Sequence, residues 1–392
     1  MNKRQSVKYN LNKARKQNRA FSKRKSKRVG EKMVNKIGIK RYLRYVFLIV
    51  LVLLFLIWVG NIYIYISTLE FTDVVQESSE VFEVSEPDEV RKTLLIYEDV
   101  SAEDTTNLFI LLVIYNTDIS ELLIYYFPQD LYIQDDFGEI YVSIGNLTYA
   151  GNTFMYGSEH AYVLDQISTQ TALDFDSYVW IKPDLAKLFF SSETGWGREK
   201  DEVLSIFSGF TLPRLVNTYY QADIVSASLY SNLSFMDIYR YFNKIDSVIS
   251  SDRHEFIDLG QEDFTRKEQL DARGEVDVLN LEKFDNSIQQ NYGVISSRDL
   301  AREQVKVEVY NATEVPLYAR KMARRINNLG CNIVRYENTS YEYEKDYIYI
   351  PNREEYSVAL GKVKQVIEDP VIKEKRPDFL TTADIVVVLG EE

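Results

Sequence analysis

The run LFILLVIY at Leu108–Tyr115 consists of eight consecutive apolar residues, and it decides the fold class of the region around it. A strand with one face in water alternates apolar and polar side chains, whereas a strand covered on both faces is apolar throughout. The run therefore predicts a buried strand with other elements packed on both faces. This favours a layered α/β domain over a half-exposed β-sandwich.

Similar runs lie on either side of this strand. Thr93–Tyr97 (TLLIY) precedes it and Leu122–Phe127 (LLIYYF) follows it, and both are expected to be strands. A shorter strand is expected at Ile140–Val142, before a turn region marked by Gly145, Asn146, Gly151 and Asn152. The polar stretch from Ser251 to Glu275 predicts a long excursion from the domain. Helices are expected around Glu202–Phe207, Phe235–Ile249 and Phe284–Tyr292.

A second, smaller unit is expected from Val305 onward. VKVEVY at Val305–Tyr310 alternates as a strand does. A helix follows, because apolar residues recur there at i, i+3, i+4 and i+7 (Ala319, Met322, Ala323 and Ile326), and Gly330 is placed to end it. Further strands are expected at Asn332–Arg335, Tyr347–Ile350 and Asp384–Leu389, with a helix near Glu354–Ile367. The order βαββαβ predicts a compact α/β sandwich.

The segment YVFLIVLVLLFLIWVGNIYIYI at Tyr45–Ile66 has 22 residues and no charge. As a helix it is roughly 33 Å long, enough to cross a hydrocarbon core about 30 Å thick. It is too long for the apolar region of a signal peptide, and no cleavage site follows it. Trp58, Tyr63 and Tyr65 near its outer end suit an interfacial aromatic belt. The sequence therefore predicts a retained transmembrane helix.

The charges on the two sides of this helix have opposite sign. Residues 1–44 carry 17 Lys/Arg and one acid, a net charge of +16. The whole chain has a net charge of −13, so residues 45–392 carry −29. The positive-inside rule then predicts a cytoplasmic N-terminus and an extracytoplasmic remainder. A membrane location with this orientation is therefore expected.

The basic tail allows two interpretations. KRKSKR at 23–28 could attract anionic lipid head groups, through Lys23, Arg24, Lys25, Lys27 and Arg28. It could instead neutralise nucleic-acid phosphates, but aromatic residues are not interleaved with it and nucleic acid is the less favoured partner. Nucleic-acid binding would show a steep dependence on salt.

Histidine and cysteine are too few for several common kinds of site. A single cysteine, Cys331, excludes an intramolecular disulfide, and it is expected to be a small buried hydrophobic residue. With only His160 and His254, the chain cannot assemble the usual Cys/His zinc site. Both histidines are expected to be structural or exposed.

The C-terminal motifs resemble a LytR C-terminal domain. VEVYNATEVPLYARKMARRINNLGCNIV contains a strand ending in an Asn-Ala-Thr turn, a helix with small residues, and a Gly-Cys-x-Ile-Val segment. ADIVVVLG at Ala383–Gly390 resembles the last strand of that domain. The resemblance covers about 85 residues, within an expected domain at 305–392.

The preceding region is similar to the catalytic domain of LytR-CpsA-Psr proteins. The segments that carry the similarity are LLIYED, FPQDLYI at Phe127–Ile133, IGNLTYAG at Ile144–Gly151, LDFDSYVWI at Leu173–Ile181 and SNLSFMDIYRYF at Ser231–Phe242. The expected order is a tail at 1–44, an anchor at 45–66, an acidic linker at 67–91 and an α/β domain at 92–295. A cell-envelope location is what the resemblance implies.

The resemblance implies transfer of a glycopolymer from a polyprenyl-pyrophosphate carrier to peptidoglycan. Such chemistry needs cations, commonly several arginines and a divalent metal held by aspartate. Asp99 and Asp130 stand at matching positions, as candidate catalytic residues and Mg²⁺ ligands, but a turn cap at Asp130 and a solvated Asp99 are the favoured alternative. The family's arginine in Pro-Arg-Asp is Gln129 here. Candidate phosphate-binding arginines lie later in the chain, at Arg198, Arg214 and Arg240.

Two functions remain in competition. The segment from Thr93 to Ile181 has fourteen Asp/Glu and no Lys or Arg, which should repel a pyrophosphate. This favours a pseudoenzyme, a non-catalytic binding or scaffold member that contacts cell-wall polymer or a polyprenyl lipid. The alternative is a divergent phosphotransferase in which Asp99, Asp130 and distant arginines rebuild the site.

Overall fold

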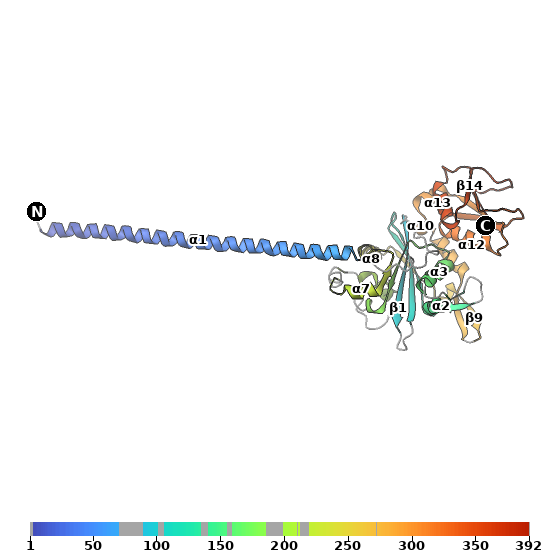
Figure 1. The fold of residues 1–392 in the computed structure, drawn as a ribbon, viewed down its shortest axis with the longest axis horizontal. Helices are drawn as coiled ribbons and strands as arrows, with labels where there is room; N and C mark the ends of the chain where they lie inside the picture. Colours follow the sequence, from blue (N-terminus) through green and yellow to red (C-terminus); the bar gives the residue numbers. More distant parts are fainter. Residues whose placement is uncertain are drawn as a thin grey trace. The chain divides into compact units, whose positions relative to one another are not determined.

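A computed structural model of the chain describes residues 3–69, 89–100, 106–134, 140–154, 159–185, 199–209, 211, 219–271 and 273–391. The chain divides into two compact units, Met1–Tyr65 and Ile66–Glu392. The first is part of helix α1 (Lys3–Ser67), a single helix that is continuous from the basic tail into the apolar segment (Figure 1).

The apolar part of α1 fits a membrane anchor. It runs from Tyr42 to Ser67 and is long and apolar enough to cross a membrane. Only 6% of its most apolar window is buried, unlike the mostly buried core helix of a soluble protein. The apolar side chains from Val46 to Ile57 are all more than a third exposed. In water such a surface would be costly, and in hydrocarbon it is matched to its surroundings.

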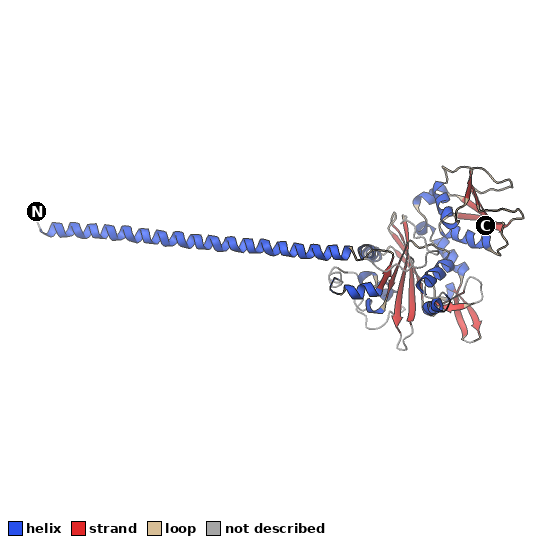
Figure 2. Cartoon of the chain, in the orientation of Figure 1, coloured by secondary structure: helices blue, strands red, loops and turns tan. Residues whose placement is uncertain are grey.

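A six-stranded sheet, here called sheet A, organises the region after the anchor (Figure 2). Its strand order is β7-β6-β1-β2-β3-β8, and β1, β2 and β3 are successively antiparallel. β6 runs parallel to β1, and β8 runs parallel to β3. The strands are β1 (Val90–Val100), β2 (Thr106–Asn116), β3 (Glu121–Phe127), β6 (Ser177–Ile181), β7 (Leu229–Ser231) and β8 (His254–Asp258).

Both faces of sheet A are covered, as the run in β2 predicts. Every residue from Leu108 to Tyr115 is at most 8% exposed. Alternate β-strand residues such as Leu94 and Ile96 pack against α2 (Leu147–Phe154), α3 (Glu159–Thr171) and α9 (Leu281–Gln290). The other face lies toward α5 (Lys200–Leu204), whose Val203 lies near Leu95 and Tyr97. It also lies toward α8 (Phe235–Ser250), which is on the opposite side of β1 from α3 (Figure 1). The layered α/β expectation is confirmed.

Two parts of this domain differ from the sequence expectation. The Gly- and Asn-rich segment expected as a turn region is the 3₁₀ helix Ile144–Asn146 followed by α2. The polar excursion expected from Ser251 contains β8, β9 and the start of β10, and β9 and β10 join β4 and β5 in a second sheet of order β5-β4-β10-β9. That sheet consists of β4 (Tyr132–Gln134), β5 (Tyr141–Ser143), β9 (Thr265–Leu270) and β10 (Gly274–Leu279). The backbone of β9 is paired, while half of its side chains are exposed and none is buried, so the sequence of β9 shows no apolar alternation.

The C-terminal part is a sheet with helices on one face, here called sheet C. Its order is β12-β11-β15-β13-β14, and α12 (Tyr318–Asn328) and α13 (Ser357–Val366) pack against it with a common apolar core. The strands are β11 (Lys306–Asn311), β12 (Asn332–Asn338), β13 (Tyr347–Tyr349), β14 (Val371–Lys373) and β15 (Ile385–Leu389). The predicted βαββαβ order is confirmed and is extended by β14, which is too short to show a period.

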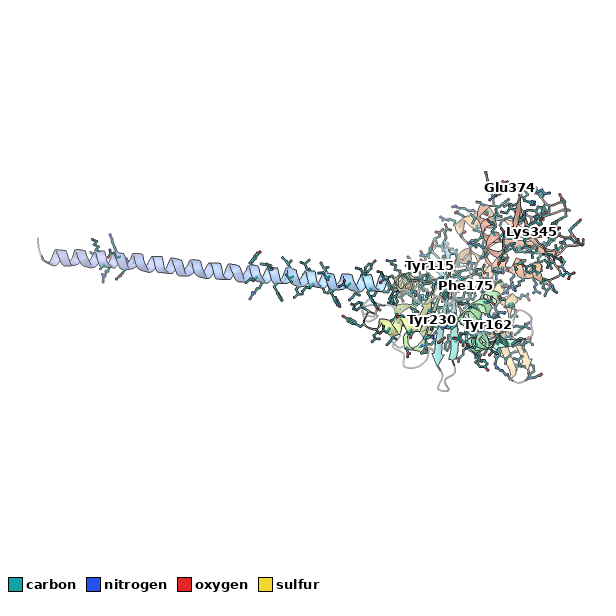
Figure 3. All side chains as sticks on the ribbon, in the orientation of Figure 1. Tyr115, Tyr162, Phe175, Tyr230, Lys345 and Glu374 are labelled. Carbon is teal, nitrogen blue, oxygen red and sulfur yellow. The ribbon has the colours of Figure 1, made fainter. Side chains whose placement is uncertain are left out.

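Two details at the end of α12 agree with the sequence. Gly330 has a φ of 97°, a backbone conformation that glycine adopts without strain, and it follows the helix as expected of a C-terminal cap. Cys331 is 1% exposed and belongs to the core of this sheet, as a buried hydrophobic residue. Figure 3 shows how densely the described side chains fill the two sheet domains.

Candidate functional site at the carboxyl edge of sheet A

The two candidate aspartates come to the same edge of sheet A. Ile110 of β2 pairs with Ile96 of β1 on one side and with Phe127 of β3 on the other. Ile96 and Phe127 are therefore level. Asp99 follows three residues later within β1, whereas the chain leaves β3 after Phe127 and turns before Asp130. Asp130 is exposed, in the turn after β3. The backbone of Asp99 belongs to β1, and its side chain lies outside the described residues.

Polar side chains from β1 and β6 meet at this edge. Because Tyr97 pairs with Ile181 in parallel register, Glu98 and Lys182 follow at equivalent positions on neighbouring strands. Trp180 donates from Nε1 to Glu98 Oε1 at 2.8 Å. Lys182 donates from Nζ to the Tyr230 hydroxyl at 2.8 Å and also lies 4.6 Å from the Tyr230 ring centroid. We call Glu98, His160, Trp180, Lys182 and Tyr230 the edge cluster.

The N-terminal end of α3 completes the edge cluster. The His160 ring packs against Trp180 with centroids 4.5 Å apart and against Tyr230 with centroids 5.0 Å apart. Its Nδ1 is 3.9 Å from Glu159 Oε1. The His160 side chain is 16% exposed and lies between these two aromatic rings.

Burial raises the pKa of Glu98. The hydrogen bond from Trp180 and the charge of Lys182 act in the opposite direction, and Glu159 adds to the increase. Desolvation disfavours the charged carboxylate more than these two neighbours favour it. The edge cluster therefore holds a carboxyl that takes up a proton more readily than an exposed glutamate.

Glu98→Gln is expected to increase stability at neutral pH. A raised carboxyl pKa means that the folded state binds the proton more tightly than the unfolded state, so ionisation above that pKa costs stability. Glutamine stays neutral and keeps an oxygen that can accept from Trp180. The Tm of the variant should exceed that of the wild type at pH 7–8, and the difference should shrink as the pH falls through the raised pKa. A Tm difference independent of pH between 4 and 8 would contradict this assignment.

Of the arginines that were candidates for a phosphate site, only one lies within the described residues. Arg198 and Arg214 lie outside the described residues. Arg240 lies on α8 with a side chain 64% exposed, and its Nη1 is 3.6 Å from Asp237 Oδ1. Among the described residues, no three His, Cys, Asp or Glu side chains are grouped as they would be around a metal ion.

The opposite face of sheet A encloses a small apolar hollow. It has space of about 10 Å³, which is no more than one water molecule requires. The described residues that line it are Leu95, Tyr97, Phe109, Leu111, Tyr126, Val203 and Ile206.

The sequence did not reveal the edge cluster. Glu98 precedes the candidate Asp99 in LLIYED, but its partner Trp180 is 82 residues away and depends on the parallel pairing of β1 with β6. The available signal was a polar residue directly after an apolar run, which marks the end of a buried strand. Combining Glu98 with Lys182, which directly follows LDFDSYVWI, would have required the strand order.

Comparison with known proteins gives one family match and several matches to solved structures. Residues 304–392 match the family model described as LytR cell envelope-related transcriptional attenuator. Residues 304–392 form a LytR C-terminal domain. The expectation from its motifs is thus confirmed. No curated protein matches the sequence.

Several solved structures resemble the chain with low sequence identity. TagT bound to LI-WTA is 15% identical with a TM-score of 0.36, covering 54% of this chain and 94% of the other. A protein from Streptococcus agalactiae is 11% identical with a TM-score of 0.37, covering 57% and 90%. TagV from B. subtilis is 10% identical with a TM-score of 0.36, covering 51% and 96%.

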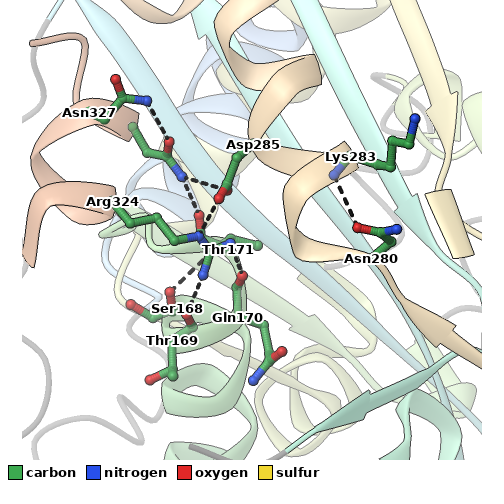
Figure 4. A network of polar contacts seen from close by, with 10 residues as sticks. Ser168, Thr169, Gln170, Thr171, Asn280, Lys283, Asp285, Arg324 and Asn327 are labelled. Atoms are coloured by element: carbon green, nitrogen blue, oxygen red, sulfur yellow. Dashed lines mark hydrogen bonds and ion pairs between the residues drawn. The ribbon is translucent and has the colours of Figure 1, made fainter. Parts of the chain in front are cut away.

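The LytR C-terminal domain binds the end of α3 that is opposite the edge cluster (Figure 4). Arg324 of α12 donates from Nη2 to the carbonyl oxygen of Gln170 at 2.6 Å, and its Nε is 2.6 Å from Asp285 Oδ2 of α9. Asn328 donates to the carbonyl oxygen of Thr171 at 2.8 Å. These donors satisfy carbonyls that the last turn of a helix leaves without an intrahelical partner.

A second ion pair lies beside this contact. Arg325 Nη2 is 2.6 Å from Asp174 Oδ1, in the segment that joins α3 to β6. Both side chains are about 30% exposed, so the pair is partly shielded from solvent. The LytR C-terminal domain therefore holds both the carboxyl end of α3 and the chain leading to β6.

Proposed function

We propose that this chain is a membrane-anchored cell-envelope protein of the LytR-CpsA-Psr kind, with its N-terminus in the cytoplasm and the rest outside a bacterial plasma membrane. In this proposal residues 92–295 form a non-catalytic binding or scaffold module in cell-wall glycopolymer assembly. The LytR C-terminal domain, the motifs of residues 92–295 and the apolar helix Tyr42–Ser67 support it. The division into tail, anchor, linker and two domains follows the same proposal.

The charge of the edge cluster is the observation that carries the non-catalytic role. Among the described residues, Lys182 is the cation of the edge cluster. Its Nζ donates a hydrogen bond to the Tyr230 hydroxyl, and its charge lies near the carboxyl of Glu98. Gln129 occupies the position at which the family has an arginine, and it offers one neutral hydrogen bond in place of a charged fork. A pyrophosphate carries several negative charges, so this edge is poorly suited to hold it.

A divergent phosphotransferase is the second candidate, and the presence of Asp99 near the end of β1 and of Asp130 in the turn after β3 favours it. Two carboxylates at one sheet edge are ligands that Mg²⁺ accepts, with water and substrate phosphate completing its octahedron. The metal would neutralise charge on the transferred phosphoryl group. Arg198 and Arg214 would then be the phosphate-binding residues.

Binding of polyprenyl pyrophosphate separates the two candidates. The full chain in detergent would be titrated with that lipid by calorimetry, with and without Mg²⁺. The scaffold proposal predicts that Mg²⁺ does not strengthen binding and that Asp130→Asn behaves as the control Asp118→Asn, which lies exposed in the β2–β3 turn. Mg²⁺-dependent binding that Asp99→Ala and Asp130→Asn abolish would overturn it in favour of the enzyme.

We also propose that the basic tail contacts anionic lipid head groups. The residues concerned are Lys23, Arg24, Lys25, Lys27 and Arg28, whose side chains lie outside the described residues. Each cation near an anionic surface adds about 1 kcal/mol of attraction, which would hold the tail to the membrane. Nucleic acid remains the less favoured partner.

A further inference from the structure

β12 forms an open edge of sheet C. It is the first strand in the order β12-β11-β15-β13-β14, and its pairing among the described residues is with β11. Six of its seven residues are exposed, including Val334 at 43% and Tyr336 at 51%. A strand edge of this length with apolar side chains presents free backbone groups to another strand.

The backbone groups that face outward can be identified from the pairing with β11. Thr339 donates its N–H to the carbonyl oxygen of Asn311 at 2.9 Å, so the backbone of Thr339 points toward β11. Successive residues of a strand point alternately to the two sides. The N–H and C=O of Glu337 and Arg335 therefore point inward, and those of Tyr336 and Asn338 point outward.

We propose that two copies of this chain pair through their β12 strands, antiparallel, about a two-fold axis at Tyr336. Tyr336 then exchanges both backbone hydrogen bonds with its counterpart, because its N–H and C=O already face outward. In this register Arg335 lies directly opposite the partner's Glu337, and Glu337 lies opposite the partner's Arg335. Residues opposite each other without mutual hydrogen bonds have the closer side chains in an antiparallel pair, so both ion pairs are in reach.

The charges select this register over its neighbours. An axis at Arg335 would place two guanidinium groups opposite each other and would use backbone groups that are already paired with β11. An axis at Val334 or Asn338 would place neither Arg335 nor Glu337 opposite an opposite charge. Like charges directly opposite each other are destabilising and opposite charges stabilising, so the register at Tyr336 is favoured.

A second copy suits this edge better than an unrelated peptide strand. Arg335 and Glu337 lie two residues apart on one face, with Arg335 Nη1 3.7 Å from Glu337 Oε1. This arrangement is complementary to itself under two-fold rotation, which an isologous interface requires. An apolar peptide would leave both charges without a partner across the strands. The membrane anchor also confines the copies to one surface, which raises their effective concentration.

Charge reversal on the full chain tests the dimer by sedimentation in detergent. Arg335→Glu and Glu337→Arg each place like charges opposite one another and should each weaken self-association by about tenfold. An equimolar mixture of these two variants should recover association, as heterodimers with both ion pairs restored. The double variant R335E/E337R should associate as the wild type does. Arg353→Glu, which breaks the exposed pair with Glu374 at 3.1 Å elsewhere in this domain, is the matched control and should change nothing.

Two results would overturn the proposal. A wild-type chain that is monomeric at every concentration would exclude the dimer. Association that is equally strong in wild type, Arg335→Glu and Glu337→Arg would place the contact elsewhere, as in pairing of the transmembrane helices. Both readouts are independent of lipid binding, so they are separate from the test of the proposed function.

Discussion

Replacing Trp180 with alanine is expected to lower the free energy of unfolding by about 4 kcal/mol. Trp180 is fully buried in sheet A, and its ring packs against His160. Truncation leaves a cavity in a layer covered on both sides and also removes the donor to Glu98. Urea unfolding of the full chain in detergent, followed by circular dichroism, measures the loss.

Trp180→Phe separates packing from the hydrogen bond. Phenylalanine keeps most of the apolar contact and removes the Nε1 donor, so a loss of about 1–2 kcal/mol is expected. If Trp180→Phe destabilised the chain as much as Trp180→Ala, the hydrogen bond rather than the packing would dominate. A Trp180→Ala loss below about 1 kcal/mol would contradict the buried position itself.

Replacing Arg324 with alanine is expected to weaken the attachment of the LytR C-terminal domain to α3 by about 3 kcal/mol. The Arg324 and Asp285 side chains are 18% and 21% exposed, so removing the guanidinium leaves a poorly solvated carboxylate without its ion-pair partner. The carbonyl oxygen of Gln170 loses its donor as well. Hydrogen exchange should therefore accelerate in the last turn of α3 and in α9.

The control for this prediction is Arg320→Ala, on the exposed face of α12. It removes a guanidinium from the same helix and should leave exchange in α3 unchanged. Arg324→Lys keeps the charge but cannot form the same planar set of hydrogen bonds, and should fall between the two. Equal exchange rates in Arg324→Ala and Arg320→Ala would show that Arg324 does not hold the two domains together.

The fold was predictable where burial determines which positions of an element carry apolar residues. β2 is apolar at eight successive positions because elements cover both of its faces, and the stripe on α12 follows from a single apolar contact face. α2 was missed because Gly151 indicates a turn by composition. A Cβ at Gly151 would lie 2.8 Å from Glu159 Cα, so this glycine permits close packing of two helices. The turn or helix propensity of a residue gives no information about such a contact between helices.

The candidate site was predictable only in its outline. Asp99 and Asp130 follow apolar strands, and the antiparallel order β1-β2-β3 brings their positions to one edge. Their roles stay predictions. Glu98 and Trp180 were not recognised, because their contact depends on the register between strands about 80 residues apart. The edge strands β8 and β9 were missed for a related reason, since backbone pairing holds them while their side chains are largely polar.

Cys331 makes the native chain a ready background for chemical labelling. It is the only cysteine in the sequence, and burial raises the pKa of its thiol to about 12. At neutral pH the thiol is protonated and buried in the core, so maleimides should not react with it while the chain is folded. A cysteine introduced at an exposed position would then be the single reactive group. Membrane-impermeant reagents on intact cells could report, segment by segment, which parts of the chain face the outside.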